Sequence, residues 1–248
     1  MILLSNGGSN VCLSQQPADW ICVGTVDGLA FLRRESEQWN VVRHALRGCS
    51  ISAVTQAPDG ALYAASHGVG VARSIDAGIT WQWVNKGIDH LDLWSARAGK
   101  LQNCDVVCVG SLPAHLYISE DSGESWRELT ALREVKSIGA WCFPPPPHAG
   151  HIKDITFDGN NLMVGVEIGA LLVSQDFGKS FVELPIDPNP VECDTPDRPA
   201  CGPAKPPDRC ERYRRLNDKR GPRAHLDQEH HACGRGIPGC NRLSSTGS

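Results

Sequence analysis

Short apolar runs that lead into polar turns recur along this chain of 248 residues. Three of the runs, at residues 69–72, 115–118 and 170–173, precede octapeptides of one form: SIDAGITW, SEDSGESW and SQDFGKSF. In such a turn an Asp side chain accepts backbone hydrogen bonds, a Gly supplies a positive φ, and an aromatic residue starts the return strand. The pattern therefore predicts a β-hairpin at each octapeptide.

The octapeptides share four positions, occupied by Ser, Asp, Gly and an aromatic residue. An active site normally combines different residues from different repeats, whereas these positions recur once in every copy. We therefore interpret them as structural, and not as catalytic or metal-binding. The structural set is Ser74, Asp76, Gly78 and Trp81; Ser119, Asp121, Gly123 and Trp126; and Ser174, Asp176, Gly178 and Phe181.

Further apolar runs upstream of the octapeptides extend the repeat. A strand with a small residue near its end is predicted at residues 21–25, 61–66, 106–111 and 162–166, and another before it at residues 51–55, 91–96 and 152–157. In the first repeat, residues 34–39 form a decayed octapeptide that keeps Trp39. Each unit then holds four strands, A to D, with the octapeptide between C and D.

Four-stranded units at a period of about 40 to 50 residues are the signature of a β-propeller. The repeats of a β-helix, the competing solenoid fold, are much shorter. We therefore predict an all-β fold over residues 1–194, a β-propeller of four-stranded antiparallel blades that is incomplete at about four blades. Residues 195–248 are predicted to be a disordered tail.

The composition changes abruptly after Asp194. Residues 195–248 contain nine Arg, seven Pro, six Gly and four Cys, but no Val, Phe, Met or Trp, so they cannot form blades. The cysteines and nearby histidines lack the close paired spacing of a zinc site. The arginines alternate with acidic residues and prolines, which does not fit a nucleic-acid-binding tail.

A shifted reading frame is an alternative origin for this tail. Regrouping the codons one nucleotide later permits an A-strand-like run, HRIVLH, from residues 195–201. The same shift permits SGDRAHTW from residues 219–227, another octapeptide with Ala at the Gly position. On this hypothesis a frameshift near residue 194 has removed further blades, and the nucleotide sequence of the gene decides it.

Charge and cysteine content narrow the class of protein. The net charge of -4 gives no case for nucleic acid. The first residues, MILLSNGG, lack the features of a signal peptide, and no segment approaches the ~18 apolar residues of a transmembrane segment, so a cytoplasmic location is expected. Cys22, Cys108 and Cys142 lie in or beside apolar runs and the total of 11 is odd, which favours reduced thiols over disulfides. No cofactor is implied.

The octapeptides resemble Asp-box motifs, also called bacterial neuraminidase (BNR) repeats, which occur in sialidases, sortilin-type receptors and photosystem II assembly factors. More narrowly, ICVGTVDGL, GSLPAHLYISEDSGESW, WCFPPPPHAGHI and VGVEIGALLVSQD resemble a bacterial family of Asp-box propellers labelled glycosyl hydrolase or sialidase-like, over roughly residues 1–194. The resemblance implies the propeller fold. It implies little about function, because an Asp box marks a blade and not an activity.

The blade topology suggests where a ligand would bind. B–C and D–A loops emerge on one face of a propeller, and A–B and C–D turns on the other, so the octapeptides lie opposite the expected pocket. The B–C loops carry Asp27, His67, Pro113 with His115, and Glu167. A D–A loop, WCFPPPPHAGH at residues 141–151, joins a stiff proline run to aromatic and histidine residues. It is either a rigid loop that covers apolar surface or part of a ligand-binding site; the candidate ligand-binding residues are Trp141, His148, His151, Glu167 and His67.

A histidine and a carboxylate on this face could act as acid and base, with Glu167 as the candidate catalytic residue, or hold a metal. One His pair is a weak metal signal, and no metal site is predicted. The chain lacks the Arg-Ile-Pro motif of sialidases, and Tyr63 and Tyr117 lie in or beside strands, so sialidase activity is not expected.

The leading prediction for function is a non-catalytic binding or interaction scaffold for an unknown protein or glycan ligand. The alternative is a carbohydrate-active hydrolase of the sialidase-like group. An assembly factor for a membrane complex is a third class, with no specific support in the sequence.

Overall fold

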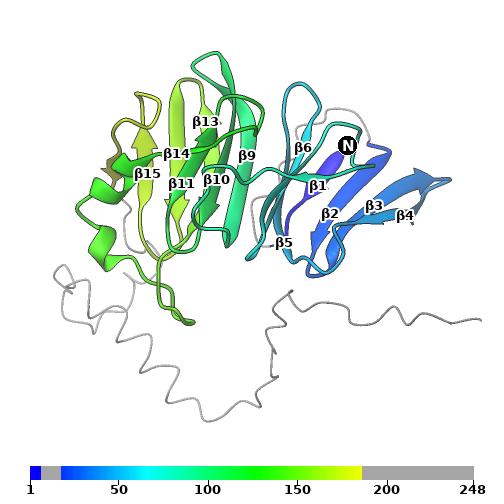
Figure 1. Ribbon diagram of the computed structural model, residues 1–248, viewed down its shortest axis with the longest axis horizontal. Helices are drawn as coiled ribbons and strands as arrows, with labels where there is room; N and C mark the ends of the chain where they lie inside the picture. The colour runs from blue at the N-terminus through cyan, green and yellow to red at the C-terminus, as the bar shows by residue number, and fades with distance from the viewer. Residues whose placement is uncertain (7–17, 186–248) are drawn as a thin grey trace, which may run out of the picture.

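The computed structural model describes residues 1–6 and 18–185. Within them the chain is all-β and forms four four-stranded sheets of the propeller-blade type. Figure 1 shows the sheets side by side in chain order, from the blue first sheet to the yellow-green fourth. The predicted tail, the shifted reading frame and the boundary at residue 194 all lie outside the described residues.

Each sheet is ordered from an innermost to an outermost strand. The strands are β1 (Ile2–Leu4), β2 (Trp20–Thr25), β3 (Gly28–Glu35) and β4 (Gln38–Ala45); β5 (Ile51–Gln56), β6 (Leu62–Ser66), β7 (Gly70–Ser74) and β8 (Gln82–Trp83); β9 (Leu93–Leu101), β10 (Cys104–Ser111), β11 (Leu116–Ser119) and β12 (Arg127–Glu128); and β13 (Ile152–Asp158), β14 (Asn161–Val166), β15 (Leu171–Ser174) and β16 (Val182–Leu184). Two short 3-10 helices, η1 (Thr130–Glu134) and η2 (Ile138–Ala140), follow β12.

The second, third and fourth sheets have the predicted A to D order, and their neighbouring strands are antiparallel. The first sheet differs, because its innermost strand β1 pairs parallel with β2. This strand was not predicted. The decayed octapeptide at residues 34–39 is the turn between the third and fourth strands of this sheet, where the repeat predicts it. Its conformation is a two-residue hairpin turn, in which Ser36 and Glu37 have φ of 47° and 72°, and Trp39 is 39% exposed.

The three octapeptides form turns with one shared hydrogen-bond pattern. In each, the Ser hydroxyl donates to the Asp carboxylate at 2.8 Å and accepts the Gly N–H at 2.8 Å. A second hydroxyl residue follows the Asp by four positions in each turn: Thr80, Ser125 or Ser180. Both its backbone N–H and its hydroxyl donate to the Asp carboxylate. The Ser and Asp side chains of each turn therefore find these hydrogen-bond partners within the octapeptide itself.

The glycine of each octapeptide turn also lies against the preceding sheet. A Cβ at Gly78 would lie 2.4 Å from Phe31, one at Gly123 3.1 Å from Tyr63, and one at Gly178 2.5 Å from Leu129. The Tyr63 hydroxyl donates a 2.8 Å hydrogen bond to the carbonyl of Ser122 in the next turn. Glycine is thus required twice, for its positive φ and for the close approach.

An arginine from each of the first three sheets reaches the following turn. Arg43 donates to the Ala77 carbonyl at 2.8 Å, and its guanidinium lies 4.2 Å from the Phe31 ring centroid. Arg73 donates to Glu124 at 2.9 Å. Arg127 lies 5.8 Å from the ring centroid of Phe177. Cation–π and charge contacts therefore supplement apolar packing at every described boundary between sheets.

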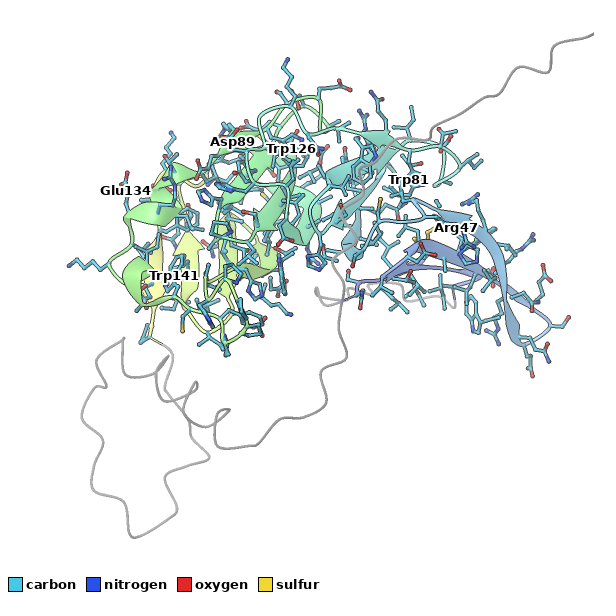
Figure 2. The ribbon with its side chains drawn as sticks, turned by 60° about the horizontal axis from the view of Figure 1, so that its bottom comes forward. Arg47, Trp81, Asp89, Trp126, Glu134 and Trp141 are labelled. Carbon is cyan, nitrogen blue, oxygen red and sulfur yellow. The ribbon has the colours of Figure 1, made fainter. Side chains whose placement is uncertain are left out.

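Three hydrophobic clusters fill the spaces between neighbouring sheets. The first joins Phe31 to Leu62, the second joins Tyr63 to Val107, and the third joins Leu116 to Leu172. A single four-stranded sheet cannot bury both of its faces, so each blade depends on its neighbour for its core. Figure 2 shows Trp81, Trp126 and Trp141 spaced along the molecule, with Arg47 at the end away from Glu134 and Trp141.

Buried thiols occur where the sequence predicted them. Cys22 and Cys108 are fully buried, and burial raises the pKa of Cys22 to about 12 and that of Cys108 further. Cys142 is half-buried. A thiol with a pKa raised in this way is a poor nucleophile at neutral pH and acts as a small core residue. No helix among the described residues has the length and hydropathy needed to cross a membrane.

The approach of Gly78 to Phe31 gives a stability prediction. Gly78→Ala should lower the free energy of unfolding by roughly 2–4 kcal/mol, because a left-handed backbone and an overpacked ring both oppose the methyl group. Gly48→Ala is the control, since Gly48 has φ of 81°, close to the 80° of Gly78, but no atom within 4 Å of the added Cβ. Urea unfolding should show a loss of only about 1 kcal/mol for the control. Equal losses for the two variants would contradict the packing argument.

The octapeptide turns also predict acid sensitivity. Hydrogen bonds from Ser125 and Ser180 hold the pKa of Asp121 and Asp176 at about 2, below the ordinary 3.8. A depressed pKa stabilises the folded state above the ordinary value and loses that contribution as the pH falls from 3.8 towards about 2. Asp176→Asn should be less stable at neutral pH and should show a smaller loss across this window. Urea midpoints measured over a pH series test this expectation.

Candidate functional site

Three histidine–carboxylate pairs lie on the face formed by the B–C and D–A loops. His67 Nδ1 lies 2.9 Å from Asp92, His115 Nδ1 lies 2.7 Å from Glu128, and His151 Nε2 lies 2.9 Å from Glu167. In the first sheet Asp27 accepts the Gly48 N–H at 2.7 Å. The loops on this face are thus fixed to one another by polar side chains.

A β-bulge near the start of the innermost strand re-aims one side chain in three of the sheets. The register shifts leave Ser52 of β5, Trp94 of β9 and Lys153 of β13 without an opposite residue. Bulges commonly turn a side chain away from its expected direction. Here the Ser52 hydroxyl donates to the Leu93 carbonyl at 2.7 Å, and the Lys153 ammonium lies 5.7 Å from the Trp94 ring.

Trp94 is the centre of an aromatic cluster that comprises His67, Trp94, Phe143 and His151. The ring centroid of Trp94 lies 3.9 Å from that of His151, 4.8 Å from that of His67 and 5.9 Å from that of Phe143. Phe143 and His151 are 4.8 Å apart and perpendicular. The cluster joins the B–C loop of the second sheet to β9 of the third and to the D–A loop before the fourth.

His151 is the most buried member of the cluster, with a relative exposure of 0%. Burial lowers its pKa, while Glu167 and the more remote Asp92 raise it and Lys153 lowers it further. Nδ1 of His151 and Nε1 of Trp94 are buried and have no hydrogen-bond partner among the described residues. The imidazole is therefore held neutral at neutral pH, in a stack where a positive charge is unfavourable.

Glu167 accepts two contacts from within the protein. Besides His151, the Lys153 ammonium lies 3.2 Å from Oε2 of Glu167. The rim of the cluster is partly open to solvent, with side-chain exposures of 32% for Glu167, 38% for Lys153 and 37% for Asp92. The geometry combines a rigid aromatic centre with a rim of charged groups that are already paired.

The candidate residues from the sequence are only partly brought together. His67, His151 and Glu167 belong to one group around Trp94. Trp141 instead packs in the core between the third and fourth sheets, and its Nε1 donates to the Ser137 hydroxyl at 3.0 Å. His148 Nδ1 lies 3.3 Å from the backbone carbonyl of Phe143. Its ring makes no ring contact with Trp94 or His151 among the described residues.

Sequence reasoning did not select Trp94, Asp92, Lys153 or Phe143 as candidates, although Phe143 lies in the predicted D–A loop at residues 141–151. Trp94 and Lys153 each follow the first residue of an innermost strand, where Ser52 stands in the second sheet. An aromatic or charged residue at that position of an otherwise apolar run was the available signal. The sequence alone does not show that a bulge turns this residue towards the loops, because a bulge depends on pairing between strands.

A second histidine group lies beside Glu128. Oε1 of Glu128 lies 2.7 Å from Nδ1 of His115 and 2.8 Å from Nε of Arg133, and the ring of His90 lies 3.9 Å from that of His115. Burial lowers the pKa of His115. No group of three or more His, Cys, Asp or Glu side chains in the described part of the chain is arranged to hold a metal ion.

A hollow among the described residues lies away from the aromatic cluster. It has a volume of about 400 Å³ and is lined by β1 and by the later residues of β5, β9 and β13, which lead into the A–B turns. Asp154 is the only carboxylate in its lining, and its Oδ1 accepts the Ile155 N–H at 2.8 Å. This hollow therefore lies on the same side of the sheets as the octapeptides, and the expected site on the opposite face stays a prediction.

No protein-family model matches the chain, and no curated protein matches it. Solved structures do resemble it. A YCF48 structure bound to a D1 peptide has 16% identity and a TM-score of 0.47 over 71% of this chain and 57% of its own. YCF48 from Cyanidioschyzon merolae has 19% identity and a TM-score of 0.46 over 69% of this chain and 54% of its own. A GH74 xyloglucanase from Xanthomonas campestris has 17% identity and a TM-score of 0.47 over 72% of this chain and 28% of its own. The chain thus spans little more than half the length of the first two.

The environment of His151 predicts its titration. Its pKa should lie below the ordinary 6.5, because burial disfavours the imidazolium. Since the folded state binds the proton less well than the unfolded state, His151 should cost stability as the pH falls below 6.5. Lys153→Met should raise the midpoint and Glu167→Gln should lower it, as followed by imidazole NMR signals. Shifts in the opposite directions would contradict this electrostatic assignment.

Proposed function

We propose that this protein is a non-catalytic binding scaffold of the Asp-box β-propeller type, and that the face with the B–C and D–A loops is its binding surface. The aromatic cluster around Trp94 carries the proposal. It is assembled from three sheets, tied by paired charges and partly open at its rim. Rigid aromatic side chains surrounded by paired polar groups are common at the centre of protein interfaces.

The geometry around Glu167 gives less support to a hydrolase. A glycosidase of the usual kind needs two carboxylates that flank the scissile bond. Glu167 already contacts His151 and Lys153, and the His151 ring has no exposed surface. The lining of the 400 Å³ hollow contains a single carboxylate, that of Asp154, where a glycosidase of this kind would need two. One observation favours the hydrolase alternative: the carboxylates of Asp92 and Glu167 lie on the same face, and both raise the pKa of His151.

The partner is better matched by a protein segment than by a glycan. Sugar rings bind aromatic residues through an open ring face, whereas the Trp94 indole is contacted by His67, Phe143, His151 and Lys153. The rim of the cluster stays accessible, and it carries the ammonium of Lys153 and the carboxylates of Asp92 and Glu167. A segment with polar and charged side chains complements such a rim. A cytoplasmic location stays a prediction from the sequence.

Binding and hydrolysis can be separated with matched variants. The full chain is used to capture partners from a bacterial lysate. Its affinity for a captured partner should fall by about tenfold or more when Glu167→Gln and Asp92→Asn remove rim charges. Glu120→Gln is the control, because Glu120 pairs with Arg127 at 2.9 Å beside an octapeptide turn on the other face. Its capture should be unchanged.

The same proteins are tested on a panel of aryl glycosides. The proposal expects no turnover by any of them. Turnover by the full chain that Glu167→Gln abolishes and Glu120→Gln leaves intact would replace the scaffold proposal by the hydrolase alternative.

A further inference from the structure

β4 differs from the outermost strands of the other three sheets that the structure describes. It has eight residues, whereas β8 and β12 have two and β16 has three. It forms the edge of its sheet, and the β3–β4 hairpin projects at one end of the molecule (Figure 1). Trp39, Val41 and Val42 on it are 39%, 54% and 45% exposed. Edge strands are normally short or protected by charges, because their free backbone groups pair with other strands.

The hairpin geometry shows which backbone groups of β4 are free. Ser36 and Glu37 form a two-residue turn, so the flanking pair Glu35 and Gln38 is hydrogen-bonded and the pairs then alternate. The N–H and C=O of Asn40 therefore point towards β3, and those of Trp39 and Val41 point away from it. Neither Trp39 nor Val41 has a backbone hydrogen bond to another described element.

We propose that β4 binds β4 of a second copy of this chain, antiparallel, about a two-fold axis at Asn40. The two Asn40 residues then face each other as a non-hydrogen-bonded pair. Trp39 of each copy faces Val41 of the other as a hydrogen-bonded pair, because both have outward backbone groups. Four backbone hydrogen bonds and two aromatic–β-branched contacts result. A two-fold pairing of one strand with itself is the simplest closed dimer.

The charges of the strand fit this partner. Residues 38–42 (QWNVV) carry no charge, so no like charges meet at the axis. The nearest charged residues are Glu37 before this segment and Arg43 after it, and the antiparallel arrangement brings the acidic end of one copy near the basic end of the other. A bulge at Val42 interrupts the register of β4 with β3, which limits the pairing to the first half of the strand and makes the dimer weak.

A disulfide trap tests the proposed axis. Non-hydrogen-bonded antiparallel pairs bring Cβ atoms close enough for a disulfide. Asn40→Cys in the full chain should therefore form a covalent dimer under mild oxidation. Gln38→Cys is the matched control on the same strand, because its facing residue is Val42, which has no thiol. The exposed native Cys104 contributes equally to both variants.

A proline variant tests the backbone contacts without a cysteine. The Val41 N–H points away from β3, so Val41→Pro leaves the β3–β4 ladder intact and removes two intermolecular hydrogen bonds per dimer. Sedimentation equilibrium over a concentration series should show self-association of the original chain that is weakened by about tenfold or more in this variant. Val182→Pro, at a residue that is 65% exposed on β16, should leave self-association unchanged.

Three outcomes would overturn the proposal: a monomer at all concentrations, equal dimer yields from Asn40→Cys and Gln38→Cys, or coupling of the Asn40→Cys thiol to a different protein when a lysate is oxidised. Circular dichroism of each variant identifies any that fails to fold. In that case the sedimentation of the original chain still decides whether self-association exists.

Discussion

The structure depends on the burial of one sheet face against the next. A four-stranded sheet by itself exposes an apolar face, and each of the three hydrophobic clusters is shared by two sheets. Full burial of a side chain such as Phe31 contributes roughly 2–3 kcal/mol. The octapeptide turns make this packing specific, because their glycines allow the turn backbone to touch Phe31, Tyr63 and Leu129 of the preceding sheet. Without this close approach, neighbouring sheets would lose packing against each other, although each sheet would keep the hydrogen bonds between its own strands.

The same packing positions the candidate site. Bulges at the start of β9 and β13 place Trp94 and Lys153 on the loop face, and the boundary between the third and fourth sheets brings His151 against Trp94. The burial of this histidine and the charged groups on the rim are the basis of the proposed recognition role. The site and the 400 Å³ hollow are at opposite ends of the inner strands.

Local chemistry explains what could be predicted from sequence. Asp, Gly and an aromatic residue at fixed spacing define a turn without reference to other parts of the chain, so the hairpins and the four-strand unit were predictable. The parallel pairing of β1 and the bulges were not, since they depend on contacts between strands. Trp141 illustrates the limit for the site. Gly150 leaves room for its Cβ and Gly169 for its indole, and its position in a proline-rich loop does not reveal this packing.

The octapeptide turns also bear on the order of folding. Each turn closes its own hydrogen bonds within eight residues, so its hairpin can form from local contacts with little loop-closure entropy. Its glycine finds a partner only when the preceding sheet is already in place. The hairpins of this part of the chain are therefore expected to form before neighbouring sheets pack against each other, wherever along the chain folding begins.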